Sequence, residues 1–212
     1  MEKVGAAHLV LASGSPRRRA YLDMMGIAHS VLASGEDEAL LEGEPPEEFT
    51  LRTARQKAAS VASRQPQGTW VLGADTAVVV DDQVLGKPND LADARRMLHL
   101  LSGRGHRVLT AVALWRTGHG LFADFLTQTQ VFFRLLNERW LEGYLATGEP
   151  MDKAGAYGIQ GQGALLVTGI TGSYTNVVGL PLAETADLLE RAGLYQPFFR
   201  VGSPSPEPGG AG

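Results

Sequence analysis

One short stretch near the N-terminus constrains the fold more than any other. Residues 9–11 are apolar, and they are followed by the turn Ser13-Gly14-Ser15 and then by Pro16. An apolar run of this length bounded by turn residues is typical of a buried strand. Ser15 is a favourable N-cap, and Pro16 suits the first helical position, where a missing N–H costs nothing. The sequence therefore predicts a strand, a tight turn and a helix that stops at Gly26.

The first turn of this predicted helix carries Arg17, Arg18 and Arg19. Cations at a helix N-terminus oppose the helix dipole, so these arginines do not stabilise the helix itself. A bound anion would resolve the conflict. Phosphate is the natural candidate, because free backbone N–H groups also point out of such a turn. A solvated basic turn without a ligand is the alternative, and the pattern taken alone leaves it open.

Charge and cysteine content exclude several classes of protein. The 212 residues carry a net charge of −4, so no overall cationic field is present to hold a nucleic-acid duplex. The absence of cysteine excludes disulfides, thiolate zinc sites and cysteine catalysis. No apolar run reaches the ~18 residues that span a bilayer, and the N-terminus lacks an apolar signal region. We expect a cytoplasmic protein that binds neither nucleic acid nor membranes.

The lysines are informative because arginine dominates the basic residues. Of 19 basic residues, the four lysines are Lys3, Lys57, Lys87 and Lys153. Such a chain keeps lysine mainly where a compact ammonium on a flexible stem is needed. Lys57 lies in a predicted helix over residues 47–64, and Lys87 follows a predicted hairpin of residues 77–80 and 84–85. An ordinary surface position is the alternative for each.

A carboxylate follows a second apolar strand, which is predicted to begin at residue 70. This strand ends in Gly73-Ala74-Asp75-Thr76, where two small residues leave room for a ligand beside the backbone. In open α/β sheets, ligands bind beyond the carboxyl ends of strands. The acidic loop Glu36-Asp37-Glu38 follows another predicted strand, residues 29–33, and could supply a carboxylate to a cation. A turn role for Asp75 and a merely solvated acidic loop are the alternatives.

A glycine-rich segment over residues 148–163 is a third candidate for ligand contact. It contains Asp152, Lys153 and Gln160 among five glycines. Permissive loops of this kind often contact ligands, although a flexible connector is the alternative. The patterning around it predicts helices over residues 91–101, 137–147 and 181–193, strands over 108–115 and 121–133, and a last strand pair over 164–170 and 173–178.

The chain is expected to form one domain over residues 1–201. Residues 202–212 are rich in Pro, Gly and Ser, and this composition predicts a disordered tail because nothing in it can be buried. Within the domain, the candidate residues combine cations with carboxylates. Cations neutralise phosphate oxygens, and carboxylates hold a divalent metal and orient water. The combination suits attack of water on a nucleotide phosphate.

Five motifs, in this order, resemble the Maf-like nucleoside triphosphate pyrophosphatase family. They are Leu11-Ala12-Ser13-Gly14-Ser15-Pro16-Arg17-Arg18, Gly73-Ala74-Asp75-Thr76, Leu85-Gly86-Lys87-Pro88, Leu101-Ser102-Gly103 and Asp152-Lys153-Ala154-Gly155-Ala156-Tyr157-Gly158-Ile159-Gln160. The resemblance spans residues 9–193. It implies an α/β fold of the ITPase-like kind, in which helices flank a mixed elongated β-sheet and two lobes enclose a central cleft. It also implies metal-dependent hydrolysis of a nucleoside triphosphate to the monophosphate and pyrophosphate.

The resemblance also implies roles for single residues. Asp75 matches the general base, and Lys57 and Lys87 match catalytic positions at the phosphates. Glu38 and Asp75 match metal-associated positions for Mg²⁺ or Mn²⁺, and the register among Glu36, Asp37 and Glu38 stays open. The expected substrate-binding residues are Ser13, Arg17, Arg18, Thr76, Asp152, Lys153 and Gln160. Among these, the positions that match substrate specificity are Arg17, Thr76 and Gln160.

The run from Asp152 to Gln160 resembles the branch of the family that hydrolyses dTTP and UTP. The Gln160 amide offers a donor and an acceptor to adjacent groups of a uracil-type edge, and it cannot pair in the same way with cytosine. The alternatives are a 7-methyl-GTP pyrophosphatase, a general phosphohydrolase and a non-catalytic nucleotide-binding regulator of cell division. Whether the chain forms a homodimer stays open.

Overall fold

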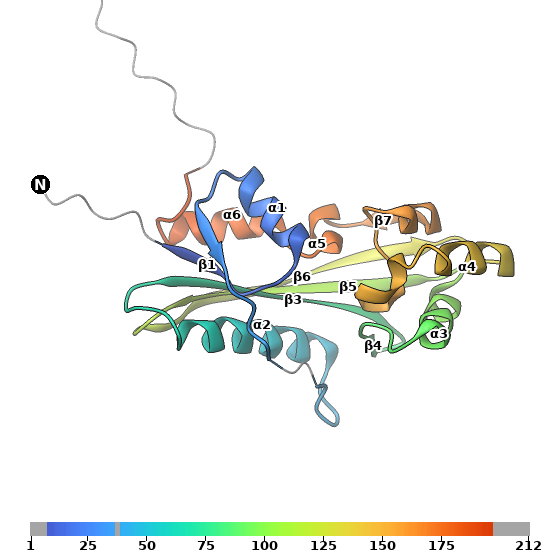
Figure 1. Cartoon of the computed structure of the whole chain (residues 1–212), viewed down its shortest axis with the longest axis horizontal. Helices are drawn as coiled ribbons and strands as arrows, with labels where there is room; N and C mark the ends of the chain where they lie inside the picture. The colour runs from blue at the N-terminus through green and yellow to red at the C-terminus, as the bar shows by residue number, and fades with distance from the viewer. Residues whose placement is uncertain (1–7, 37–38, 197–212) are drawn as a thin grey trace, which may run out of the picture.

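A mixed β-sheet runs along the molecule, and helices cover both of its faces (Figure 1). The computed structural model describes residues 8–36 and 39–196, and the predicted tail over residues 202–212 lies outside these ranges. The strands are β1 (Leu9–Leu11), β2 (His29–Val31), β3 (Trp70–Val80), β4 (Gln83–Leu85), β5 (Gly105–Arg116), β6 (Gly120–Phe133) and β7 (Val167–Thr171). The α-helices are α1 (Pro16–Met24), α2 (Pro46–Ala62), α3 (Leu91–Leu101), α4 (Glu138–Leu145), α5 (Tyr174–Val178) and α6 (Leu182–Arg191). None of the helices in the described ranges combines the length and apolarity of a bilayer span.

The sheet has the order β2-β1-β3-β5-β6-β7, and β4 pairs with β3 outside this path. β1 runs parallel to both of its neighbours, and the other pairs are antiparallel. The three long strands β3, β5 and β6 give the sheet its length. The predicted α/β class, with a mixed elongated sheet flanked by helices, is therefore confirmed.

Local sequence signals set several element ends where they were predicted. The Ser15 hydroxyl accepts the N–H of Arg18 and caps α1, with Pro16 in its first turn. Asp90 caps α3 in the same way. Asp81 and Asp82 both have positive φ, which is the backbone conformation that a two-residue hairpin turn between β3 and β4 requires.

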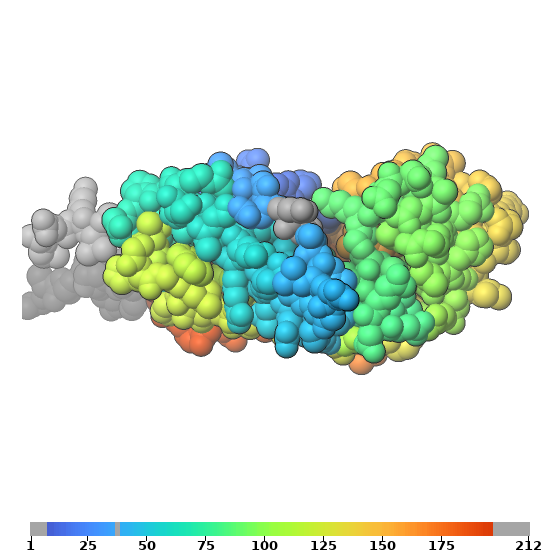
Figure 2. Space-filling model, turned by 90° about the horizontal axis from the view of Figure 1, so that it is seen from below, coloured from blue at the N-terminus to red at the C-terminus, as the bar shows by residue number. Residues whose placement is uncertain are grey.

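Two large apolar clusters lie towards opposite ends of the sheet. One joins β1, the start of β3, α1 and α6, and includes Leu22 and Leu188. The other joins β4, α3 and α4, and includes Leu98 and Leu141. Because both clusters pack on the same long strands, the molecule has two lobes on one sheet. In Figure 2 the lobe that contains α2 (cyan) and the lobe that contains α3 (green) lie side by side along the long axis of the molecule.

One edge of β3 is left without a strand between the two lobes. β1 pairs with residues 70–72 of β3, and β4 pairs with residues 78–80. Residues 73–77 pair only with β5 on the other side. The prediction that the strand ends at Asp75 is therefore wrong, because the long ladder with β5 carries β3 on to Val80. The opening beside Asp75 arises instead because its parallel neighbour β1 stops.

The predicted last strand pair is only half correct. Val167–Thr171 forms β7, but residues 162–166 form a 3₁₀ segment and Tyr174–Val178 forms the helix α5. The Ser173 hydroxyl accepts the N–H of Asn176 and caps this helix, and Gly179 ends it with a φ of 118°. These end signals outweigh the strand preference of the two adjacent valines.

Candidate active site

A cleft of about 910 Å³ opens at the uncovered edge of β3. This volume is within the usual range for small-molecule sites. Every predicted site residue in the described ranges lines it: Ser13, Arg17, Arg18, Lys57, Asp75, Thr76, Lys87, Asp152, Lys153 and Gln160. Glu38 lies outside the described residues, whereas Glu36 lines the cleft. The fold thus gathers residues that are far apart in the sequence.

A buried ion pair lies in the wall of the cleft. Lys57 Nζ donates a hydrogen bond of 2.7 Å to Asp75 Oδ1. Only 7% of Lys57 and 4% of Asp75 are exposed, so the surface alternative for Lys57 is wrong. Within the described part of the chain, Asp75 Oδ2 has no hydrogen-bond partner. One carboxylate oxygen is therefore left for water or a cation.

Gly73 explains how α2 comes close enough to form this pair. A Cβ atom at position 73 would clash with the backbone oxygen of Ala54 and would lie 2.8 Å from the backbone nitrogen of Ala58. Only glycine permits the helix backbone to lie directly on the strand. Since Lys57 precedes Ala58 on the same helix, this close approach brings its ammonium to Asp75.

Arg18 is bound by oxygen atoms of the protein. Its Nε donates to the carbonyl of Gly179 at 2.8 Å, and its Nη1 and Nη2 donate at 3.0 Å to Ser13 Oγ and Thr76 Oγ1. The side chain is buried and connects α1, β3 and the end of α5. These bonds satisfy three of the N–H donors of the guanidinium. Oxygen atoms of the protein, and not a bound anion alone, therefore stabilise this cation at the helix N-terminus.

The hydroxyl of Thr76 belongs to a chain of hydrogen bonds with one direction. Thr110 Oγ1 donates to the carbonyl of Asn176 at 2.9 Å, which uses its only proton. Thr76 Oγ1, 3.0 Å from Thr110 Oγ1, must therefore be the donor of that pair. Because Thr76 also accepts from Arg18, one lone pair is left. Thr76 can accept a hydrogen bond from a ligand in the cleft but cannot donate one.

Further cations lie on the other walls. Lys87 is exposed at the end of β4 and forms no ion pair with the described residues. Lys153 Nζ donates to Asp152 Oδ1 at 2.5 Å, and Arg17 Nη1 lies 4.0 Å from Asp152 Oδ2. The hydrogen bond from Lys153, helped by the charge of Arg17, holds the pKa of Asp152 below its usual value. The Asp152 carboxylate thus lies between the charges of Lys153 and Arg17 and keeps these two cations close together.

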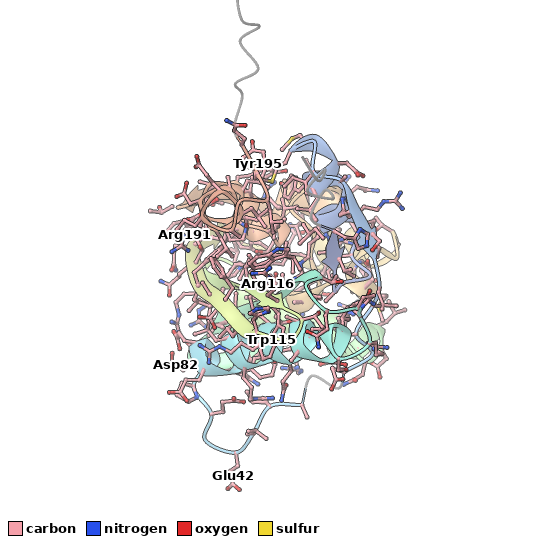
Figure 3. The ribbon with its side chains drawn as sticks, turned by 90° about the vertical axis from the view of Figure 1, so that its left-hand side faces the viewer. Glu42, Asp82, Trp115, Arg116, Arg191 and Tyr195 are labelled. Carbon is pink, nitrogen blue, oxygen red and sulfur yellow. The ribbon has the colours of Figure 1, made fainter. Side chains whose placement is uncertain are left out.

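The loop between β2 and α2 forms a third wall. Figure 3 shows Glu42 at its tip, where the loop projects away from the body of the molecule. Arg52 of α2 fastens this loop, because it donates to both carboxylate oxygens of Glu44 at 2.6 Å and to the carbonyl of Ala39 at 3.0 Å. Glu36 and Leu40 line the cleft from this side. The loop therefore adds a carboxylate to the rim.

Glu149, which also lines the cleft, was missed by the sequence analysis. Its carboxylate accepts hydrogen bonds from Tyr144 and from the backbone of Gln162 and Gly163. The dense glycines at positions 158, 161 and 163 were the available signal. Their spacing predicts a flexible loop, whereas in the fold they make room for a partly buried carboxylate.

Most of the length of this chain aligns with known proteins. Residues 8–192 match the family model described as Maf-like protein. A dTTP/UTP pyrophosphatase from Anaeromyxobacter dehalogenans is 51% identical over 197 residues, covering 92% of this chain and 99% of that protein. A dTTP/UTP pyrophosphatase from Salmonella typhimurium is 49% identical over 181 residues, covering 85% of this chain and 91% of that protein. Among solved structures, a HAM1 protein from Coxiella burnetii aligns with a TM-score of 0.48 and 15% identity over 87% of this chain and 99% of that chain.

Proposed function

We propose that this chain, which belongs to the Maf-like protein family, is a pyrophosphatase that hydrolyses dTTP and UTP to the monophosphate and pyrophosphate. Relatives at about half identity over nearly the full length carry the name dTTP/UTP pyrophosphatase. The observation that supports the chemistry best is the buried Lys57–Asp75 pair, which lies in a large cleft lined by further cations. A carboxylate with one oxygen unpartnered among the described residues, surrounded by cations, suits hydrolysis of a phosphate anhydride.

Asp75 is the proposed general base. Its free oxygen accepts a proton from a water molecule as the oxygen of that water forms a bond to the α-phosphorus. The bond from the α-phosphorus to the oxygen that bridges to the β-phosphate then breaks, and pyrophosphate leaves with that electron pair. Lys57 holds the other oxygen of Asp75, so the base keeps one orientation during the reaction.

Three cations that line the cleft are proposed to bind the triphosphate. Lys87 and Arg17 approach the cleft from different lobes, and Lys153 lies beside Arg17 through Asp152. Cations placed where negative charge develops stabilise the transition state and the leaving pyrophosphate. A substrate that contacts both lobes would also be held in one orientation for attack.

A divalent cation fits this cleft as a partner of the substrate. In the ranges 8–36 and 39–196, no three acidic or histidine side chains gather into a metal site. Mg²⁺ usually keeps several of its waters and takes one or two carboxylates together with substrate phosphates, so Asp75 would contribute through a bound water, which leaves Oδ2 able to accept the proton. Asp75, with Glu38 as the predicted second carboxylate, would hold Mg²⁺ or Mn²⁺. The cation would neutralise phosphate charge.

The proposed preference for uracil and thymine depends on hydrogen-bonding direction. A uracil-type edge presents a carbonyl, an N–H and a carbonyl in turn, and Gln160 can pair with two adjacent groups. Thr76 can only accept, so either Thr76 or the Gln160 amide oxygen can take the single N–H of uracil or thymine, and neither oxygen finds a donor at the bare ring nitrogen of cytosine. A mismatched base would leave these polar groups unpaired, which is strongly unfavourable.

The test is a substrate panel with the purified full-length protein. Release of pyrophosphate is measured with dTTP, UTP, CTP, GTP, ATP and 7-methyl-GTP in the presence of Mg²⁺ or Mn²⁺. The expected result is the highest kcat/KM with dTTP and UTP. Full activity without any divalent metal would remove the metal from the proposal. Highest activity with 7-methyl-GTP, release of orthophosphate, or binding without turnover would instead support the other pyrophosphatase branch, a general phosphohydrolase or a regulator, respectively.

A further inference from the structure

Glu149 connects both ends of the turn that carries Gln160. Its Oε1 accepts from the Tyr144 hydroxyl at 2.9 Å and from the backbone N–H of Gly163 at 3.1 Å. Its Oε2 accepts from the backbone N–H of Gln162 at 2.8 Å. The Tyr144 oxygen in turn accepts the N–H of Gly158 at 3.1 Å. One carboxylate therefore fixes residues 162–163 directly and residue 158 through a phenol.

The segment between these fixed points is a β-turn. The N–H of Gly161 donates to the carbonyl of Gly158 at 3.3 Å, so Ile159 and Gln160 occupy its central positions. Gln160 is exposed and lines the cleft, and it forms no side-chain hydrogen bond with the described residues. The side chain is thus free for a ligand, while the backbone below it is held from both sides.

The glycines around the carboxylate show how closely this segment packs. A Cβ atom at position 161 would clash with the Glu149 carboxylate. A Cβ atom at position 163 would lie 2.6 Å from the carbonyl of Gly158 and 2.7 Å from the Tyr144 oxygen. Any side chain at these positions would displace Glu149 or Tyr144. The segment is therefore built around the carboxylate.

The electrostatic state of Glu149 agrees with this role. Its partial burial would raise its pKa, but the backbone N–H groups of Gly163 and Gln162 and the Tyr144 hydroxyl outweigh this effect, so the pKa of Glu149 lies below its usual value. Glu149 is therefore ionised at neutral pH and acts only as an acceptor. Each of its three partners is a donor.

We propose that Glu149 is a positioning residue for base selection, which it serves by holding the Gly158–Gly163 segment so that Gln160 faces the nucleobase. The inference depends on the proposed function and adds a residue to it. Glu149 touches neither Asp75 nor Lys57, so its effect falls on discrimination between bases and not on proton transfer.

The experiment measures binding rather than turnover. Affinities of the α,β-imido analogues of UTP and CTP, which cannot be hydrolysed between the α- and β-phosphates, are determined by calorimetry for the wild type, Glu149→Gln, Gln160→Ala and the double variant. Glutamine keeps the shape but points an N–H₂ group at a donor, so the turn is released. We expect the UTP-to-CTP preference to fall about 10-fold in Glu149→Gln, the scale of one lost hydrogen bond to a charged group.

Controls separate positioning from general damage. Glu142→Gln removes an exposed carboxylate of α4 that pairs with Arg95, and it should leave the preference unchanged. Tyr144→Phe removes only the link to Gly158, and a smaller fall in preference is expected even if Glu149→Gln fails to fold. The pH at which kcat falls on the acid side should be the same in Glu149→Gln and Tyr144→Phe as in the wild type.

The double variant gives the sharpest outcome. If Glu149 acts through Gln160, the double variant should show the same preference as Gln160→Ala alone. The inference would be overturned if the losses of UTP-to-CTP preference in the two single variants multiplied in the double variant. It would also be overturned if the preference were unchanged in both Glu149→Gln and Tyr144→Phe. Failure of the proposed function would appear separately, as a wild type that does not release pyrophosphate from UTP.

Discussion

Replacement of Lys57 by methionine separates the two roles of this lysine. Methionine has a similar length and keeps the apolar packing of the stem, but it removes the ammonium that donates to Asp75. The carboxylate of Asp75, which is 4% exposed, is then left without its partner. The variant is therefore expected to lose both folding stability and turnover.

The size of the stability loss follows from the burial of both groups. Breaking a buried ion pair by removal of one partner typically costs about 3–5 kcal/mol, because a charge is left uncompensated. In a chain of this size, each kcal/mol lowers Tm by about 2–4 °C, so Tm should fall by roughly 6–20 °C. Turnover should fall about 10- to 150-fold, equivalent to ~1.5–3 kcal/mol for a hydrogen bond to a charged group.

Lys87→Met is the matched control, because Lys87 is exposed and forms no ion pair with the described residues. It should lose turnover to a similar extent while Tm changes by less than about 2 °C. Unfolding free energies from urea titration of Lys57→Met, Asp75→Asn and the double variant complete a cycle, with an expected coupling of ~1–3 kcal/mol. Additivity within about 0.5 kcal/mol, or an unchanged Tm in Lys57→Met, would refute the buried pair as described.

Three further predictions test other parts of the molecule. Asp75→Asn should lower kcat for pyrophosphate release by ~10²–10⁴-fold with an unchanged circular dichroism spectrum, and near-normal release would exclude Asp75 as the base. Gly73→Ala should destabilise the fold by about 1–3 kcal/mol in urea titration, because its Cβ would clash with the carbonyl of Ala54, whereas Gly86→Ala meets no atom within 4 Å and should be nearly neutral. Burial lowers the pKa of His106 from 6.5 to about 4, so between these values the unfolded chain binds a proton that the folded chain does not. The contribution of His106 to stability should therefore fall by roughly 3 kcal/mol as the pH drops from 6.5 to 4, and His106→Gln should remove that part of the pH dependence in urea titrations at fixed pH.

The sequence predicted elements well wherever a local signal decides the outcome. Ser15 and Pro16 set the start of α1, and Asp90 sets the start of α3, because caps depend only on residues within one turn. The same rule explains the error at α5. Its cap Ser173 and its stop Gly179 are local helix signals, and they outweigh the strand preference of Val177 and Val178.

The candidate site was predicted as a set of residues but not as an arrangement. Charged residues in unusual settings, such as Lys57 in an arginine-rich chain, were predicted to contact a ligand, and they do line the cleft. Nothing in the spacing showed that Lys57 would be buried against Asp75, or that protein oxygens would bind Arg18. Glu149 was missed because two of its three partners are backbone groups, which every residue carries and no sequence pattern distinguishes.

The sequence by itself determined the starts of α1 and α3, the hairpin between β3 and β4 and the residues available for chemistry, because these follow from short-range sterics and from the chemistry of single side chains. Only the tertiary structure decided where the cleft opens. β1 stops after residue 11 and β4 begins to pair at residue 78 of β3, so Asp75 lies in the middle of a strand with one free edge. Such an opening is a property of strand pairing between distant segments. It depends on how α2, Gly73 and the two lobes pack together, and no local pattern contains that information.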